Sequence, residues 1–105
     1  MEERRTIDRV KYGEKCAVVD VETGNSLYMI AENVSPLGMG LHMEADGPDL
    51  LGKDIIVVAQ TIIMYATVNR QVKEEDGSFV LGIGAKKFTS EVLQYLMDSI
   101  APMNQ

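Results

Sequence analysis

Short β-prone runs separated by turn residues dominate the chain after Glu14, and this pattern restricts it to an antiparallel β fold. Residues 16–21 and 26–32 read as two strands, and the polar, glycine-containing segment 22–25 reads as the turn that joins them. The first half of the chain is therefore expected to begin with a β-hairpin.

The next segments predict further strands of the same kind. Residues 33–38 are expected to form a turn, residues 39–43 a short strand and residues 44–49 an irregular loop. Residues 54–72 contain no Gly or Pro, and this stretch is longer than a usual strand. We expect two strands there that turn near residues 59–61, with one long bent strand as the alternative. The turn at 74–77 then joins a strand at 78–83 into another hairpin.

From Thr89 the hydrophobic period becomes that of a helix. Thr89 or Ser90 is a suitable N-cap, Glu91 places a negative charge in the first turn, and Pro102 ends the pattern. The apolar residues that recur at helical spacing are Val92, Leu93, Leu96, Met97 and Ile100. About six strands followed by one amphipathic helix predict a small antiparallel barrel that the helix closes or caps.

Size and charge narrow the class of protein. A chain of 105 residues with 46% apolar residues is expected to be one domain with a hydrophobic core. It has no apolar run of eighteen residues and no secretory signal, so we expect a cytoplasmic protein without membrane insertion. The lone Cys16 is expected to pack as a small apolar residue rather than act in redox chemistry. A net charge of −6 argues against nucleic-acid binding, but half of the basic residues lie in the first fifteen positions.

Two short motifs carry the functional signal. Arg5 and Arg9 form R-x-x-x-R, whereas Asn33, Ser35 and Gly38 form N-x-S-x-x-G. A guanidinium grips phosphate oxygens, pairs with the O6 and N7 edge of guanine and stacks on a purine. The second motif adds an amide, a hydroxyl and a glycine that lets backbone approach a ligand. Each motif alone is weak, because basic pairs usually lie on solvated faces and Asn, Ser and Gly are ordinary turn formers. Together they suit a phosphorylated purine.

In this combination, order and spacing the two motifs resemble those of the PilZ family, whose members bind the bacterial second messenger cyclic di-GMP. The resemblance covers essentially the whole chain. It implies an all-β fold, a six-stranded antiparallel split β-barrel with a C-terminal α-helix. Within a single PilZ domain of residues 1–105, it places a flexible arginine arm at 1–12, the barrel at 13–88 and the helix at 89–101.

The resemblance also implies a role for each motif residue. Arg5 and Arg9 are expected to hold guanine edges and phosphates of cyclic di-GMP. Asn33 is expected to reach a guanine edge and Ser35 a phosphate or guanine, while Gly38 keeps the backbone clear for the ligand.

Arg4 immediately precedes the arginine pair and is expected to add a third guanidinium to the site. In the PilZ family a basic residue at this place goes with capture of an intercalated pair of ligand molecules. Two cyclic di-GMP molecules per chain are therefore expected.

The function implied is that of a cyclic di-GMP receptor, which changes conformation on binding and signals to an unidentified protein partner. Motility and exopolysaccharide production are the pathways that the resemblance indicates. The alternative is a PilZ-like protein-interaction module that does not bind nucleotide. We expect no enzymatic activity, cofactor or metal, because the sequence lacks a recognisable catalytic or metal-ligating pattern and its one histidine, His42, lies on a predicted strand.

Overall fold

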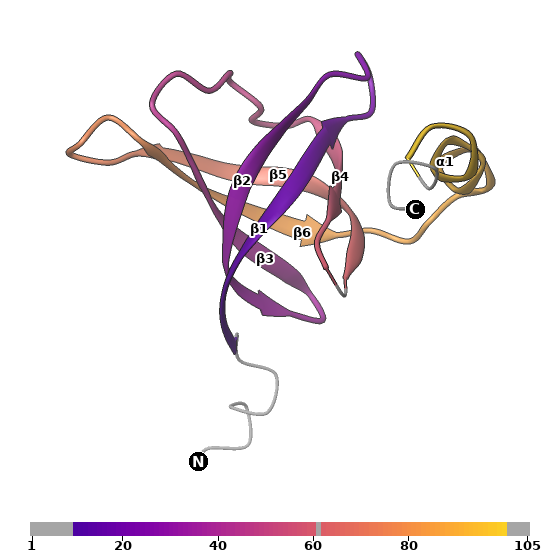
Figure 1. Ribbon diagram of the computed structural model, residues 1–105, viewed down its shortest axis with the longest axis horizontal. Coiled ribbons are helices and arrows are strands. Elements are labelled where there is room, and N and C mark those ends of the chain that lie inside the picture. The colour runs from indigo at the N-terminus through magenta and orange to yellow at the C-terminus, as the bar shows by residue number, and fades with distance from the viewer. Residues whose placement is uncertain (1–9, 61, 101–105) are drawn as a thin grey trace.

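Six strands and one short C-terminal helix make up the fold (Figure 1). A computed structural model describes residues 10–60 and 62–100. The strands are β1 (Val10–Asp20), β2 (Ser26–Ser35), β3 (Gly38–Met43), β4 (Asp54–Val58), β5 (Ile63–Lys73) and β6 (Phe79–Ala85). The helix α1 (Ser90–Tyr95) continues into a π-helical turn, η2 (Leu96–Ile100).

The strands close into a barrel in the order β1-β2-β3-β6-β5-β4, and every neighbouring pair is antiparallel. Closure comes from β1, which pairs with β2 along one side and with β4 along the other. The all-β barrel with a C-terminal helix is thus confirmed. Of the two roles expected for the helix, closing or capping the barrel, the first is excluded, because backbone pairing between β1 and β4 closes it.

The strand boundaries refine the expected ones. Residues 54–72 do form two strands, since β4 ends at Val58 and β5 begins at Ile63. β1 begins at Val10, before the expected barrel boundary at residue 13, because Val10 pairs with Val34 of β2. A bulge lies between Lys11 and Glu14, where Gly13 takes a positive φ of 64°. Residues 10–12 of the expected arm therefore belong to the barrel, and the rest of the arm lies outside the described residues.

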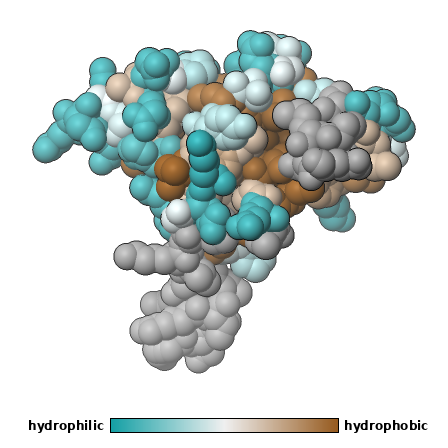
Figure 2. Space-filling view, viewed as in Figure 1, coloured by the Kyte–Doolittle hydropathy of each residue, from teal (hydrophilic) through white to brown (hydrophobic). Residues whose placement is uncertain are grey.

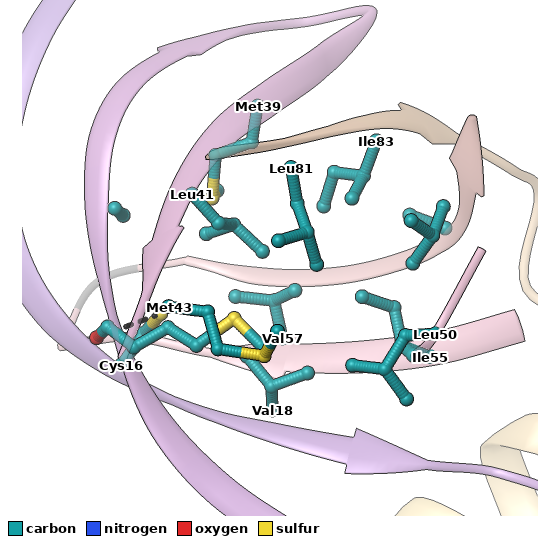
Figure 3. Packing of buried hydrophobic residues seen from close by; sticks show 14 residues of the cluster. Cys16, Val18, Met39, Leu41, Met43, Leu50, Ile55, Val57, Leu81 and Ile83 are labelled. Atoms are coloured by element: carbon teal, nitrogen blue, oxygen red, sulfur yellow. Dashed lines mark hydrogen bonds between the residues drawn. The ribbon is translucent and has the colours of Figure 1, made fainter. Parts of the chain in front are cut away.

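The barrel interior is filled by the inward residues of all six strands (Figure 3). β3 contributes Met39, Leu41 and Met43, and β6 contributes Leu81 and Ile83, all of them 0–2% exposed. Two strands that bury one face this completely fix their own register, because a slip of one residue would turn these side chains outward.

Cys16 is part of this interior. Cys16 is 2% exposed, and its thiol donates a hydrogen bond of 3.5 Å to the carbonyl oxygen of Met29. Burial raises the pKa of the Cys16 thiol to about 11, so the thiol is protonated at neutral pH. Its packing as a small apolar residue is confirmed.

The helix packs against the outer face of the barrel. Thr89 is its N-cap, since the Thr89 hydroxyl accepts a hydrogen bond of 3.1 Å from the backbone N–H of Val92. Val92 is buried in a second apolar cluster with Val19 of β1, Ile56 of β4 and Tyr65 of β5.

The apolar face of the helix is only partly covered. Leu93 and Met97, which the helical spacing placed on this face, are 48% and 68% exposed. Among the described residues, no helix has the length and apolar character needed to cross a membrane.

We expect Leu41→Ala to lower the free energy of unfolding by about 2–5 kcal/mol, because it opens a cavity among fully buried side chains. Leu37→Ala is the matched control, since Leu37 is 70% exposed on the β2–β3 turn and should change stability by about 0.5 kcal/mol or less. Urea unfolding followed by circular dichroism measures both. Equal losses for the two variants would contradict the assigned core.

Candidate functional site

The N-x-S-x-x-G motif spans the end of β2 and the start of β3. Asn33 and Ser35 lie within β2 and Gly38 begins β3, so the turn is shorter than the expected residues 33–38. The Ser35 hydroxyl accepts a hydrogen bond of 3.2 Å from the backbone N–H of Leu37 and lies 3.5 Å from the Gly38 carbonyl oxygen. Ser35 therefore stabilises the turn.

Gly38 has a structural role that the sequence did not reveal. It pairs with Gly84 of β6, and a Cβ atom added at Gly38 would collide with the backbone carbonyl oxygen of Ile83. The backbone N–H of Ala85 also donates a hydrogen bond of 2.8 Å to the Leu37 carbonyl oxygen. Glycine at position 38 thus lets β6 approach the β2–β3 turn, and its expected role beside a ligand stays a prediction.

β3 and β6 carry glycines on the same outer face of the barrel. Their register pairs Gly38 with Gly84 and Gly40 with Gly82, between the inward pairs of Met39 with Ile83 and Leu41 with Leu81. Because side chains alternate along a strand, these glycines share the face opposite the buried side chains. We call Gly38, Gly40, Gly82 and Gly84 the glycine floor. Gly38 and Gly40 are buried, whereas Gly82 and Gly84 are half-buried.

Two motif residues border the glycine floor on the β2 side. Asn33 pairs with Gly40 and Ser35 with Gly38, across the β2–β3 ladder. Val34, between them, packs against the barrel interior, so Asn33 and Ser35 face outward. The structure therefore brings Asn33, Ser35 and Gly38 together on the outer face of the sheet, where Asn33 and Ser35 are half-buried and Gly38 is buried.

Two further polar residues border the floor on the β5 side. Asn69 Nδ2 lies 2.7 Å from the point that a Cβ atom on Gly84 would occupy. Arg70 Cβ and Nε lie 3.7 and 3.9 Å from the corresponding point at Gly82. Sequence reasoning missed both residues, together with Gly40, Gly82 and Gly84.

Arg4, Arg5 and Arg9 lie outside the described residues. The first described residue, Val10, pairs with Val34 between the two outward motif residues of β2. Figure 1 shows the start of β1 and the β2–β3 turn at the same lower end of the barrel.

The outer face of β3 changes in charge away from the glycine floor. His42 is the next residue of β3 after Gly40 that faces outward. It lines an open cavity of about 530 Å³ whose other walls are mainly acidic. These walls are Glu32, Glu74, Glu75, Asp76, Ser78 and Val80. Figure 2 shows hydrophilic residues covering the projecting β5–β6 hairpin. Carboxylates there disfavour a phosphorylated ligand.

His42, Ser78 and Asp76 form a hydrogen-bonded chain in that cavity, but its order does not suit nucleophilic catalysis. The Ser78 hydroxyl donates to Asp76 Oδ1 at 2.6 Å, and His42 Nε2 lies 3.0 Å from Ser78 Oγ. Hydrogen bonds from the Ser78 hydroxyl and backbone N–H lower the pKa of Asp76, which favours its carboxylate form. The serine proton points to the carboxylate, so His42 is not oriented as its base. Within the described part of the chain, no three His, Cys, Asp or Glu residues form a group able to hold a metal ion.

Comparison of the chain with family models, with curated proteins and with solved structures gives no match.

Gly38→Ala is expected to lower the free energy of unfolding by about 1–3 kcal/mol, because its new Cβ meets the Ile83 carbonyl oxygen and forces β6 away. Gly82→Ala is the control on the partner strand. Its Cβ would make only ordinary contacts of 3.7 Å or more, so stability should hold or rise slightly. Urea unfolding of the two variants side by side is the measurement, and equal stability would rule out the proposed close approach at Gly38.

Proposed function

We propose that this chain is a PilZ-type receptor that binds cyclic di-GMP on the outer face of its barrel. The observation that carries the proposal is the meeting of Asn33 and Ser35 at the edge of the glycine floor. An amide and a hydroxyl beside glycine backbone suit a flat, polar ligand that must come close to the sheet.

Chain connectivity supports the part assigned to the arginines. Val10 pairs with Val34, and five residues of chain lead from Val10 back to Arg5. Five extended residues reach about 17 Å, which is enough to bring guanidinium groups from the start of β1 over the floor. The net charge of −6 leaves few other places for an anion, and the acidic cavity beside His42 repels one.

The proposed action is non-enzymatic. Binding orders the segment before β1 against the barrel, and the ordered segment and ligand together form a new surface for a protein partner. The alternative is a PilZ-like interaction module that recruits proteins without nucleotide. The partly uncovered helix face at Leu93 and Met97 favours this second reading, because exposed apolar side chains suit protein contacts.

Isothermal titration calorimetry of the purified chain with cyclic di-GMP separates the readings. Saturable heat with the ligand recovered unchanged supports the receptor. Absence of binding at high ligand concentration supports the interaction module and overturns the receptor proposal. Conversion of the ligand to product would instead indicate an enzyme.

Arg5→Ala and Arg9→Ala should each weaken cyclic di-GMP binding by roughly tenfold to a hundredfold. The reason is that one charge-assisted hydrogen bond contributes about 1.5–3 kcal/mol and 1.4 kcal/mol corresponds to a decade of affinity. Lys87→Ala removes an exposed cation elsewhere and should bind like the parent protein. The measurement is the calorimetric dissociation constant of each variant. If either arginine variant binds cyclic di-GMP as tightly as the parent protein, that arginine is not part of the site.

The number of cyclic di-GMP molecules bound per chain tests the proposed role of Arg4. Two stacked cyclic dinucleotides bring four phosphates together, and their repulsion requires more cationic charge than Arg5 and Arg9 supply. We expect two ligands per chain for the parent protein and for Arg4→Lys, with Arg4→Leu shifting the count toward one. A calorimetric stoichiometry near one for the parent protein, well above saturation, would contradict this.

A further inference from the structure

Apolar side chains cross the outer face of the barrel beside the acidic cavity. The register opposes Ile30 of β2 to His42 of β3, His42 to Val80 of β6, and Val80 to Val72 of β5. Directly opposed residues share a face of the sheet, and the neighbours of His42 in β3 point into the core, so all four face outward. Ile30 is 37% exposed and Val72 is 44% exposed. We call these four residues the outer row.

The outer row has a hollow on each side of His42. One is the acidic cavity, which His42 and Val80 line together with residues of the β5–β6 turn. The other is a cavity of about 170 Å³, which His42 lines together with Ile30 and Tyr28. A cavity of that size can hold one apolar side chain. The two hollows adjoin at His42, so one end of the surface is acidic and the other is apolar.

The carboxylates at the acidic end carry uncompensated charge. Glu32, Glu74 and Glu75 are exposed, and among the described residues none of them forms an ion pair with a lysine or arginine. The turn that carries two of them is well defined, because the backbone N–H of Glu74 donates a hydrogen bond of 2.7 Å to the Ser78 carbonyl oxygen. A cationic group placed in this cavity would be attracted by all three carboxylates.

The spacing of these carboxylates suits an organic cation rather than a metal ion. Within the described ranges, no group of three His, Cys, Asp or Glu residues is close enough to hold a metal ion. A lysine or arginine side chain does not need such close convergence. Its aliphatic part can lie on Val80 while its charged end reaches the carboxylates.

The other end of the surface already holds a cation. Lys15 Nζ lies 4.8 Å from the centre of the Tyr28 ring, so a second cation is disfavoured there and an apolar group is favoured. Three strand spacings of about 4.8 Å separate Ile30 from Val72, which gives roughly 14 Å. An extended peptide covers that distance with about four or five residues.

We infer that the outer row is a docking surface for a short basic and apolar peptide segment of a protein partner. A lysine or arginine of the segment lies in the acidic cavity, and an apolar side chain lies in the hollow beside Ile30 and Tyr28. Charge disfavours a second copy of this chain as the occupant, because a symmetric contact would bring the same carboxylates together. The inference does not depend on cyclic di-GMP.

The test is a titration of the full ¹⁵N-labelled chain, without nucleotide, with a blocked five-residue peptide of sequence leucine-valine-serine-lysine-lysine. We expect saturable amide shifts at Ile30, His42, Val72 and Val80. Two control peptides separate the contributions, one with both lysines replaced by glutamate and one with leucine and valine replaced by serine. Both should bind more weakly than the first peptide.

Variants of the chain test the same surface. Combined Glu32→Gln, Glu74→Gln and Glu75→Gln should weaken binding of the first peptide about threefold to tenfold. Glu91→Gln is the matched control, because it removes an exposed carboxylate on the helix and should leave the affinity unchanged. Combined Ile30→Thr and Val72→Thr keeps the β-branched shape and should weaken binding about twofold to fivefold. All three proteins should resist urea like the parent protein.

Several results would overturn the inference. Absence of shifts at millimolar peptide, or shifts confined to the helix, would show that the peptide does not dock on the outer row. Equal binding of the serine-substituted peptide, or equal weakening in Glu91→Gln, would show that overall charge alone attracts the peptide. Shifts at the outer row that depend on protein concentration without peptide would show that a second copy of the chain covers this face.

Discussion

The pairing of β3 with β6 is the constraint on which the rest of the structure depends. Its inner face presents Met39 and Leu41 against Leu81 and Ile83, and these side chains fill the barrel. Its outer face carries glycines in opposed pairs, and at Gly38 the β6 backbone comes too close for a Cβ atom. Glycine in a strand interior costs stability, so two opposed pairs need the tightly packed inner face to hold them in place.

That same pairing gives the barrel an outer surface with three distinct regions. The helix covers β1, β4 and β5 through the cluster around Val92. The acidic cavity beside His42 lies toward the β5–β6 hairpin. The glycine floor lies toward the β2–β3 turn and the start of β1, with polar residues along both of its sides. An anionic ligand is repelled by the second region, and the proposed site lies in the third.

Local sequence signals predicted much of this fold. The first hairpin and the Thr89 cap follow from patterns within a few residues, and the division of residues 54–72 into two strands follows from a length that exceeds that of a usual strand. The start of β1 at Val10 was missed, because its neighbours carry the charges of the arginine segment and the pairing with β2 is not local. The glycine floor was missed for a similar reason, since β3 and β6 are far apart in the sequence. Alternate glycines at 38 and 40 and at 82 and 84 were the available signal.

The residues of the candidate site also fall into two groups, those that the sequence identified and those that only the structure revealed. Asn33, Ser35 and Gly38 were singled out from one short segment, and the structure brings them together beside the floor. Asn69 and Arg70, which border the floor on the β5 side, were missed because the bulge at Asn69 is not visible in the sequence. The structure also shows that Ser35 stabilises the β2–β3 turn and that Gly38 permits the close packing of β6. These motif residues therefore have a structural role in addition to the proposed role in ligand binding.

The central claim is that cyclic di-GMP binds over the glycine floor. Its most direct test is an NMR titration of the ¹⁵N-labelled chain, which follows backbone amide shifts residue by residue. The account predicts large changes at Asn33, Ser35, Gly38 and Gly40, with little change in the hairpin at residues 74–78. Saturation with shifts confined to that hairpin or to the helix, or the absence of any shift, would contradict it.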